Sequence, residues 1–454
     1  MGLAYSDTVT DDDHRARTVA SDAAPSTNTA PSTSAAPSRD LSGRDLTIDF
    51  VRVFCVLLVV VIHLLEVGIG KSASGAITVT RPLEQQPWFN GVTWAGQIMP
   101  LFFVVGGFAS LTAWRRLKAR GGDAAGFVRT RVLRLALPAL PLFVFYVIVI
   151  GGALLFGADP AFLQTITTGA GSPLWFVAAY TLVQAMVPVM ARLHERAPKL
   201  TLVALLAIAI LVDVVRYSTN QGNWGLANLA FIWLFCQQVG FWYADGWFAR
   251  RAWWQLVLIA AACYALLEPL TAIGPYSPNL LVDLNPPCLP LAVVAVAQAS
   301  VLQLLKPALA RLMQTRGAQG LVFIAGTRLM TIYLWHLPLI IALSGLALVI
   351  PGATPEPGTA AWWWTRPIFY VIVLAGLYGI SFPLRWFERP RPLGPTPRSA
   401  VVFACALLTF IPAFAVLEWF LDFEYAVLGA VCLTIVALVL NRSPARKNIA
   451  MSVE

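Results

Sequence analysis

A series of twelve apolar stretches constrains the fold of this chain more than any other feature of its sequence. Each stretch is about long enough to cross a hydrocarbon core of roughly 30 Å as a helix. The ninth is overlong and contains Pro338, which predicts a kink or a break there. The stretches run over approximately residues 46–66, 92–113, 132–156, 173–191, 200–217, 226–243, 253–271, 287–305, 321–349, 365–384, 400–418 and 424–440.

The composition agrees with a chain that crosses a membrane many times. Of the 454 residues, 58% are hydrophobic and only 12% are charged, which is typical of an all-α polytopic membrane protein. Residues 1–43 are rich in Ser, Thr, Ala, Pro and Asp and contain no apolar run. We therefore expect this segment to be a disordered tail and not a signal peptide.

The lysines and arginines predict how the helices are oriented. If the N-terminus is cytosolic, the basic residues concentrate in the inner segments, as the positive-inside rule requires. Two further arginines, Arg52 and Arg328, fall within spans. The expected outer loops hold only Lys71, Arg81, Arg216 and Arg366. The sequence therefore predicts about twelve spans with both termini in the cytoplasm.

The net charge of +9 mostly reflects this topology and gives no support to a nucleic-acid partner. The six cysteines are scattered without a C-x-x-C pair, and most lie inside apolar runs. We interpret them as small apolar side chains, and we predict neither a disulfide framework nor a metal site.

Two ionisable residues lie eleven positions apart in the first span, Arg52 near its inner end and His63 near its outer end. Eleven residues return to nearly the same helix face, about 16 Å further along. Ionisable groups are costly in a bilayer and tend to be functional. This spacing suits chemistry that couples the two sides of a membrane.

Each of these residues has a carboxylate one turn away. His63 with Glu66 is either a general base with its orienting carboxylate or an interfacial histidine beside a solvated acid. Arg52 with Asp49 is either a pair aimed at an anionic or carbonyl group or a neutralised structural pair at the helix start.

The second inner loop carries seven cations in about twenty residues, more than topology requires. Guanidinium groups bind phosphates in bidentate geometry, so a phosphate-rich cytosolic ligand is one interpretation. A topological determinant that touches anionic lipid is the other. The candidate ligand-binding residues of this loop are Arg115, Arg116, Arg131 and Arg134.

Further candidates lie in the ninth stretch and in the outer loops. His336 is an intramembrane histidine, and Tyr333 one turn earlier is either its partner or a substrate contact. Arg328 on the same stretch needs an anionic partner or ligand. Asp283 and Asn285 in an outer loop either meet a polar substrate or are solvated, and Trp362 to Trp364 are expected in another outer loop.

Taken in order, these elements resemble the acyltransferase 3 family of integral membrane O-acyltransferases. The similar motifs cover about residues 44–392. They are Arg52-x10-His63, Pro100-Leu-Phe-Phe-Val-Val-Gly-Gly-Phe108, Phe127…Arg131…Arg134…Pro138, Trp175-Phe176, Gly326…Tyr333-Leu-Trp-His336 and Glu388-x-Pro390.

The resemblance implies a ten-helix acyltransferase domain over 44–392, followed by an extra transmembrane hairpin over 393–441 and a cytoplasmic tail over 442–454. It implies transfer of an acyl group, by default acetyl, from cytosolic acyl-CoA to a hydroxyl of an envelope carbohydrate or glycolipid. The acyl-CoA is a co-substrate, and no permanently bound cofactor is expected. A multi-pass protein of the plasma membrane, of bacterial type, is the expected setting.

For the site, the resemblance implies that Arg52 and His63 are essential, and we add Glu66 as the partner of His63. The basic residues Arg115, Arg116, Arg131 and Arg134 would hold the donor, and Trp175, Tyr333 and His336 would contact substrate. The alternative is a proton-coupled transporter or flippase, because twelve spans with both termini inside are also a common carrier layout. Against it, no repeat between the two halves is evident.

Overall fold

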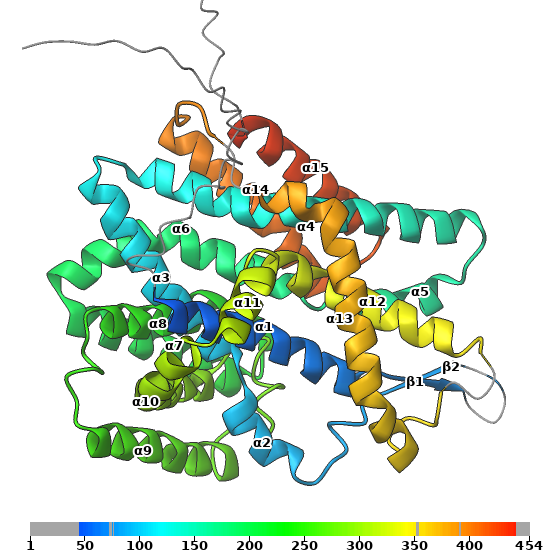
Figure 1. Cartoon of the computed structure of the whole chain (residues 1–454), viewed down its shortest axis with the longest axis horizontal. Helices are drawn as coiled ribbons and strands as arrows, with labels where there is room; N and C mark the ends of the chain where they lie inside the picture. The colour runs from blue at the N-terminus through cyan, green and yellow to red at the C-terminus, as the bar shows by residue number, and fades with distance from the viewer. Residues whose placement is uncertain (1–44, 72–74, 76, 351–353, 390–391, 442–454) are drawn as a thin grey trace, which may run out of the picture. The chain divides into compact units, whose positions relative to one another are not determined.

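The structure is a computed structural model that describes residues 45–71, 75, 77–350, 354–389 and 392–441. The two expected tails, 1–43 and 442–454, lie outside the described residues. From Asp45 onward the chain forms one compact unit built almost entirely of helices (Figure 1). The chain is therefore an all-α polytopic membrane protein, as the apolar stretches predict.

Long helices account for the apolar stretches. Within the described residues, eleven helices or helix pairs are long and apolar enough to cross a membrane. The long helices are α1 (Leu46–Glu66), α3 (Met99–Ala119), α4 (Ala124–Leu155), α6 (Leu174–Arg196), α7 (Pro198–Thr219), α8 (Asn228–Ala244), α9 (Trp253–Ala272), α10 (Leu289–Leu312), α12 (Leu329–Ala347), α13 (Ala360–Glu388), α14 (Ser399–Trp419) and α15 (Phe423–Leu440).

Shorter elements join these helices. A short helix precedes each of three long ones: α2 (Phe89–Gly96), α5 (Pro160–Gly171) and α11 (Arg316–Gly326); the 3₁₀ turn η1 (Gly222–Ala227) leads into α8. The strands β1 (Gly68–Lys71) and β2 (Ile77–Thr80) form an antiparallel hairpin in which Gly68 pairs with Thr80. This hairpin directly follows α1, the helix that carries Arg52 and His63.

The expected span over 226–243 corresponds to α8, which at 17 residues is shorter than a typical span. Most of its residues are buried, so it lies inside the bundle. Its backbone touches α3, because a Cβ on Gly240 would lie 2.1 Å from the Val104 carbonyl oxygen and one on Gly107 2.4 Å from that of Gln237. Small residues of this kind let membrane helices approach closely.

Two boundaries differ from the sequence-based expectation. The ninth stretch does break, but at Thr327 and Arg328 between α11 and α12, whereas Pro338 lies inside α12. Buried helices in a bundle can tolerate an interior proline when neighbours satisfy the freed backbone group. The expected outer-loop tryptophans, Trp362 to Trp364, and Arg366 instead form the first turns of α13.

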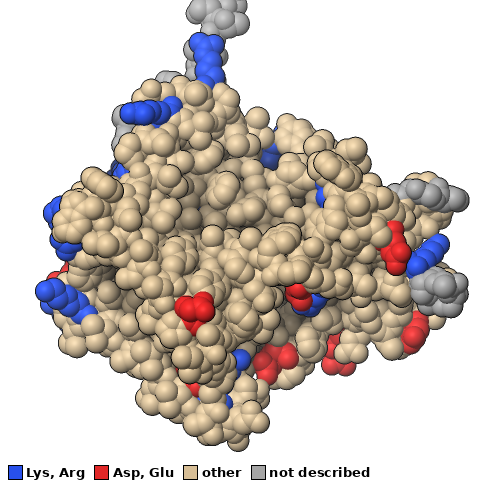
Figure 2. Space-filling view, turned by 90° about the horizontal axis from the view of Figure 1, so that it is seen from below, with Lys and Arg blue, Asp and Glu red and all other residues tan. Residues whose placement is uncertain are grey.

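Segments that are distant in sequence contact one another at both ends of the unit. At the end that the charge distribution assigns to the cytosol, here called the inner end, Lys306 pairs with Asp45 at 3.3 Å and Lys118 with Glu195 at 3.7 Å. At the opposite, outer end, Gln97 donates to the Leu280 carbonyl at 3.0 Å. Figure 2 shows a broad surface with few charged side chains, with lysine and arginine gathered toward one edge.

The C-terminal helices α14 and α15 pack against α6 and α4 (Figure 1). A Cβ on Gly429 of α15 would lie 2.1 Å from the ring of Phe143 on α4, so the two helices are in close contact. At the inner end Arg129 of α4 donates to the Leu440 carbonyl of α15 at 2.8 Å. The hairpin is thus an integral part of the packed unit.

Candidate active site

Helix α1 organises the candidate site and is in contact with α3, α10, α11, α12 and α13. Its first turn is capped by the Asp45 side chain, which accepts from the Thr47 amide at 3.1 Å. Helical spacing then places Arg52, Val56, Val59 and His63 in one row along the helix. Arg52 lies near the inner end of this row and His63 near the outer end.

Two histidines meet at the outer end of that row. The ring centres of His63 on α1 and His336 on α12 are 5.1 Å apart. His63 Nδ1 lies 3.1 Å from Glu66 Oε2, so its N–H can donate to the carboxylate and leave Nε2 with a free lone pair. Such a nitrogen can accept a proton.

His336 is fully buried and has a similar arrangement of its ring nitrogens. Its Nδ1 donates to the carbonyl of Tyr333 one turn earlier. Its Nε2 is buried and has no hydrogen-bond partner among the described residues. A buried polar atom without a partner is unusual and marks a site where a ligand or water can bind.

A cleft of about 450 Å³ runs beside the inner part of the α1 row. It ends one turn short of both histidines, since Val59 precedes His63 and Tyr333 precedes His336 in its wall. The Tyr333 hydroxyl donates to the Pro173 carbonyl at 3.2 Å. The lining residues are Arg52, Cys55, Val56, Val59, Met99, Phe102, Phe176, Tyr180, Leu329, Met330 and Tyr333. The wall is therefore mainly apolar, with one cation and two phenols.

Arg52 in the cleft wall and the neighbouring Arg131 both have unsatisfied donors. Arg52 reaches Asp49 only at 4.0 Å, and its Nε is buried without a hydrogen-bond partner among the described residues. The Nε of Arg131 on α4 is also buried without a hydrogen-bond partner among the described residues. The Arg131 guanidinium lies 4.8 Å from the centre of the Phe127 ring. Arg131 also interacts electrostatically with Arg52 and Tyr180. Two cations that interact in this way favour an anionic ligand beside them.

The other candidate cations of this loop lie nearer the surface. Arg115 Nη1 contacts Asp245 Oδ1 at 2.5 Å. Burial alone would raise the pKa of Asp245, but hydrogen bonds from Arg115 and His194 lower it below its ordinary value. Arg116 and Arg134 are exposed. The four cations thus divide between Arg131, which interacts with the cleft residues Arg52 and Tyr180, and the other three, which lie at the inner surface.

Trp175, a sequence-predicted substrate contact, lies in the aromatic core instead of in the cleft wall. Its ring stacks on Trp233 of α8 at 5.6 Å, and Trp233 in turn stacks on Phe103 at 4.3 Å. The neighbouring Phe176 does line the cleft and packs against Tyr333 at 4.7 Å. Trp175 therefore supports the wall from behind.

Three further residues have important contacts in the structure but were not among the candidate site residues predicted from the sequence. Tyr180 lines the cleft beside Arg131, one turn after Phe176 on α6. Glu388 accepts hydrogen bonds from the amide and hydroxyl of Thr331 at the start of α12. Glu388 also interacts electrostatically with Arg328 and is therefore the anionic partner that Arg328 requires. Arg366 lines a second pocket at the outer end.

The interpretation of Asp283 as a solvated loop residue is wrong. Its exposed fraction is 4%, and burial raises its pKa to about 6. Its Oδ1 accepts from the Ser277 amide at 3.5 Å, whereas its Oδ2 has no partner among the described residues. Asp283 is part of the packed outer surface around Cys288, far in sequence from the candidate site.

Comparison with known proteins gives one match. A family model described as "Acyltransferase domain" matches residues 45–386, which is more than half of the chain and includes both histidines and the cleft. No curated protein and no solved structure matches the chain.

Proposed function

Because this chain belongs to the acyltransferase 3 family and is a multi-pass membrane acyltransferase, we propose that it transfers an acyl group from cytosolic acyl-CoA to a hydroxyl of an envelope carbohydrate or glycolipid. The observation that carries the proposal is a single helix row, from Arg52 beside the cleft to His63 beside His336. In this proposal the protein lies in the plasma membrane of a bacterium, and acetyl is the default acyl group.

The donor enters from the inner end in this proposal. Its phosphates bind Arg131 together with Arg134, Arg116 and Arg115, and its pantetheine arm follows the apolar cleft. The unsatisfied Nε groups of Arg52 and Arg131 support this placement, because charge-assisted hydrogen bonds to phosphate or carbonyl oxygens would satisfy them. Arg52 and His63 are about 16 Å apart along the helix, a length comparable to that of the arm.

His63 acts as the general base. Its Nε2 takes the proton of the acceptor hydroxyl, and Glu66 stabilises the imidazolium that forms. The hydroxyl oxygen attacks the thioester carbonyl carbon, and the carbon–sulfur bond then breaks. The CoA thiolate leaves and takes the proton from His63, so the products are an O-acyl ester and free CoA. Tyr333 and His336 contact the substrate in this proposal, and Trp175 holds the wall behind them.

Acyl transfer into native membranes tests the proposal. Membranes with wild-type protein and membranes with matched amounts of His63→Ala would receive labelled acetyl-CoA, succinyl-CoA or a longer donor. We expect label in the lipid or glycan fraction only with wild type, and the labelled species identifies the acceptor. No His63-dependent label from any donor would contradict the proposal and favour proton-coupled transport, in which His63 would carry the coupled proton.

A second experiment separates direct transfer from an acyl-histidine intermediate. Wild-type protein would be incubated with labelled CoA and unlabelled acyl-CoA in the absence of acceptor. Direct transfer, which we propose, predicts no exchange of label between CoA and acyl-CoA. Exchange that disappears in His63→Ala would show that His63 carries the acyl group.

A further inference from the structure

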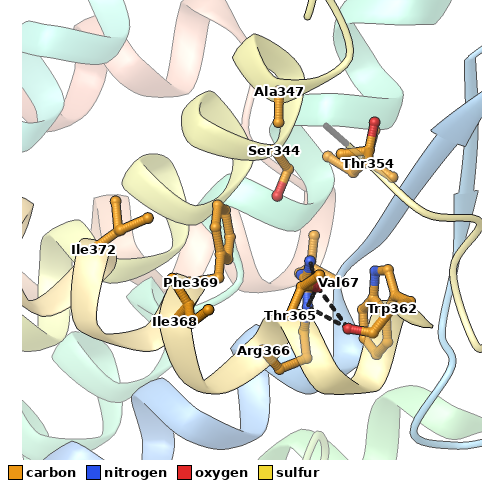
Figure 3. A pocket seen from close by; sticks show the side chains of 11 residues that line it. Val67, Ser344, Ala347, Thr354, Trp362, Thr365, Arg366, Ile368, Phe369 and Ile372 are labelled. Carbon is orange, nitrogen blue, oxygen red and sulfur yellow. Dashed lines mark hydrogen bonds between the residues drawn. The ribbon is translucent and has the colours of Figure 1, made fainter. Parts of the chain in front are cut away.

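A second pocket, of about 670 Å³, opens at the outer end between α12, α13 and the β1 strand. Figure 3 shows Arg366 and Thr365 of α13 below the space, with Ser344 of α12 and Thr354 across from them. Apolar side chains complete the wall. The lining residues are Val67, Ile69, Ser344, Ala347, Thr354, Trp362, Thr365, Arg366, Ile368, Phe369 and Ile372.

Arg366 is a buried cation, and no acidic side chain in the described part of the chain pairs with it. Its exposed fraction is 8%, and none of the ion pairs among the described residues involves it. Its guanidinium lies 4.3 Å from the centre of the Trp362 ring and 4.8 Å from that of Phe369, which hold it in place. A buried charge with no counter-ion is costly, so the pocket favours an anion.

The hydrogen bonds of Arg366 leave part of its guanidinium available. Nε donates to the Trp362 carbonyl at 3.3 Å, and Nη2 donates to the Thr365 hydroxyl at 3.0 Å. Nη1 makes no hydrogen bond to any residue that the structure describes. The hydroxyls of Ser344 and Thr354 also line the pocket, so donors for anion oxygens surround the space.

The opposite part of the wall is apolar and faces outward. Ile368 and Ile372 lie one turn apart on α13 and are 68% and 47% exposed. Exposed isoleucines on a membrane-spanning helix face lipid. A ligand with an anionic head and an apolar tail would therefore match both halves of the pocket.

The pocket lies close to the histidine pair along both helices. Val67 follows Glu66, the last residue of α1 and one turn after His63, and Ser344 follows His336 by eight residues, about 12 Å of helix rise. We propose that this pocket binds the anionic head group of an amphiphilic acceptor, with Arg366 as the anion-binding residue. The assignment of the ligand as acceptor rests on the proposed acyltransferase function, whereas the anion site itself does not.

Binding measurements on the purified full-length protein test the site without any acyl transfer. The probes are dioctanoyl phosphatidic acid, the uncharged dioctanoyl glycerol and inorganic phosphate. We expect wild type to bind phosphatidic acid more tightly than either other probe. Arg366→Gln should weaken it about tenfold or more, the effect of one charge-assisted hydrogen bond. Arg81→Gln is the matched control, because Arg81 also lies at the outer end but is exposed and paired with Glu84; it should bind like wild type.

Arg366→Lys keeps the positive charge and replaces Arg366→Gln in the test if that variant does not fold. We expect Arg366→Lys to bind phosphatidic acid several-fold more weakly than wild type, because lysine lacks the planar guanidinium group. Equal binding by Arg366→Gln and wild type, or equal binding of the uncharged lipid, would overturn the anion site. If inorganic phosphate bound as tightly as phosphatidic acid, the proposal that the ligand is amphiphilic would be wrong. Acyl-CoA affinity, measured in the same samples, should not change in Arg366→Gln. Arg366-dependent lipid binding by a protein that does not bind acyl-CoA would leave the site standing and contradict the proposed function.

Discussion

Two histidine–carboxylate pairs in this protein have almost the same geometry but different surroundings. His63 lies 3.1 Å from Glu66 at the outer end, and His194 lies 3.0 Å from Asp245 at the inner end. His194 also donates from its second ring nitrogen to Gln238 at 2.9 Å, so both of its nitrogens are occupied. His63 makes no second hydrogen bond among the described residues.

This difference in hydrogen bonding indicates which of the two pairs can react. Both ring nitrogens of His194 contact oxygen atoms of neighbouring side chains, so neither nitrogen is open to a substrate. Arg115 holds the same carboxylate, which completes a closed network between α3, α6 and α8. The ring of His63 instead keeps one nitrogen open and lies against His336, whose own Nε2 is also unpartnered. Two pairs with nearly equal nitrogen–oxygen distances therefore differ in role: His194 with Asp245 is a structural pair, and His63 with Glu66 is a candidate catalytic pair.

Replacing each histidine should separate these roles most strongly. We expect His63→Ala to lower kcat for acyl transfer by about a hundredfold to ten-thousandfold, the usual contribution of a general base, with an unchanged melting temperature in detergent. His194→Ala should lower the melting temperature, because it leaves buried Gln238 unsatisfied, while the folded fraction keeps its kcat. A loss of kcat in His194→Ala at full stability would break the comparison.

Removing the charge of each carboxylate sharpens the same contrast with a smaller effect. Glu66→Gln should lower kcat about tenfold or more with little change in KM, because the imidazolium loses its counter-charge. The equivalent Asp245→Asn should reduce stability and leave kcat unchanged. Steady-state kinetics with acyl-CoA, together with thermal unfolding, measures both. An unchanged kcat in Glu66→Gln would exclude Glu66 from the reaction.

Arginines of the inner loop offer a parallel test between a partnered and an unpartnered cation. Arg131→Ala should raise KM for acyl-CoA about tenfold, since a charge-assisted hydrogen bond contributes roughly 1.5–3 kcal/mol. Arg115→Ala should raise it less, because Arg115 is exposed and already bound to Asp245. Equal increases for the two variants would mean that the loop attracts the donor only through its total charge.

A prediction on stability concerns pH and the buried outer carboxyl. Unfolded Asp283 titrates near its ordinary value of 3.8, whereas the folded group titrates near 6, so the folded protein holds the extra proton between these values. The free energy of unfolding should therefore fall as pH rises from about 4 to 6, by at most about 3 kcal/mol. Asp283→Asn should flatten the pH dependence of the melting temperature over this range. Identical curves for both proteins would contradict the burial effect.

Much of the fold could be predicted from the sequence because the bilayer forces apolar segments into helices. The twelve stretches anticipated the long helices, and the break in the ninth was expected, although not its position. The sequence pattern alone could not place the break, since a residue far along the chain stabilises the start of α12: Glu388 accepts from the Thr331 amide, 57 residues earlier.

The site was harder to predict than the fold. Helical periodicity placed Arg52 and His63 on one row, and this needs only local geometry. Whether a polar atom is satisfied depends on neighbours that are distant in sequence. Arg115 and Arg131 look alike in the loop sequence, but only the fold brings Asp245 to the first and Arg52 and Tyr180 to the second. Tyr180 gave no motif signal that could have selected it.

The backbone contact between Gly107 on α3 and Gly240 on α8 has a consequence for substrate range. Because the two main chains touch there, the position of α3 is fixed by its own backbone and not by the side chains that line the cleft. Met99 and Phe102 lie on that same helix and face the cleft. If the cleft holds the pantetheine arm as proposed, changes in the size of these two side chains would alter the room for that arm while the helices stay in place. Under that proposal, donor preference could change through one or two substitutions, without a new fold.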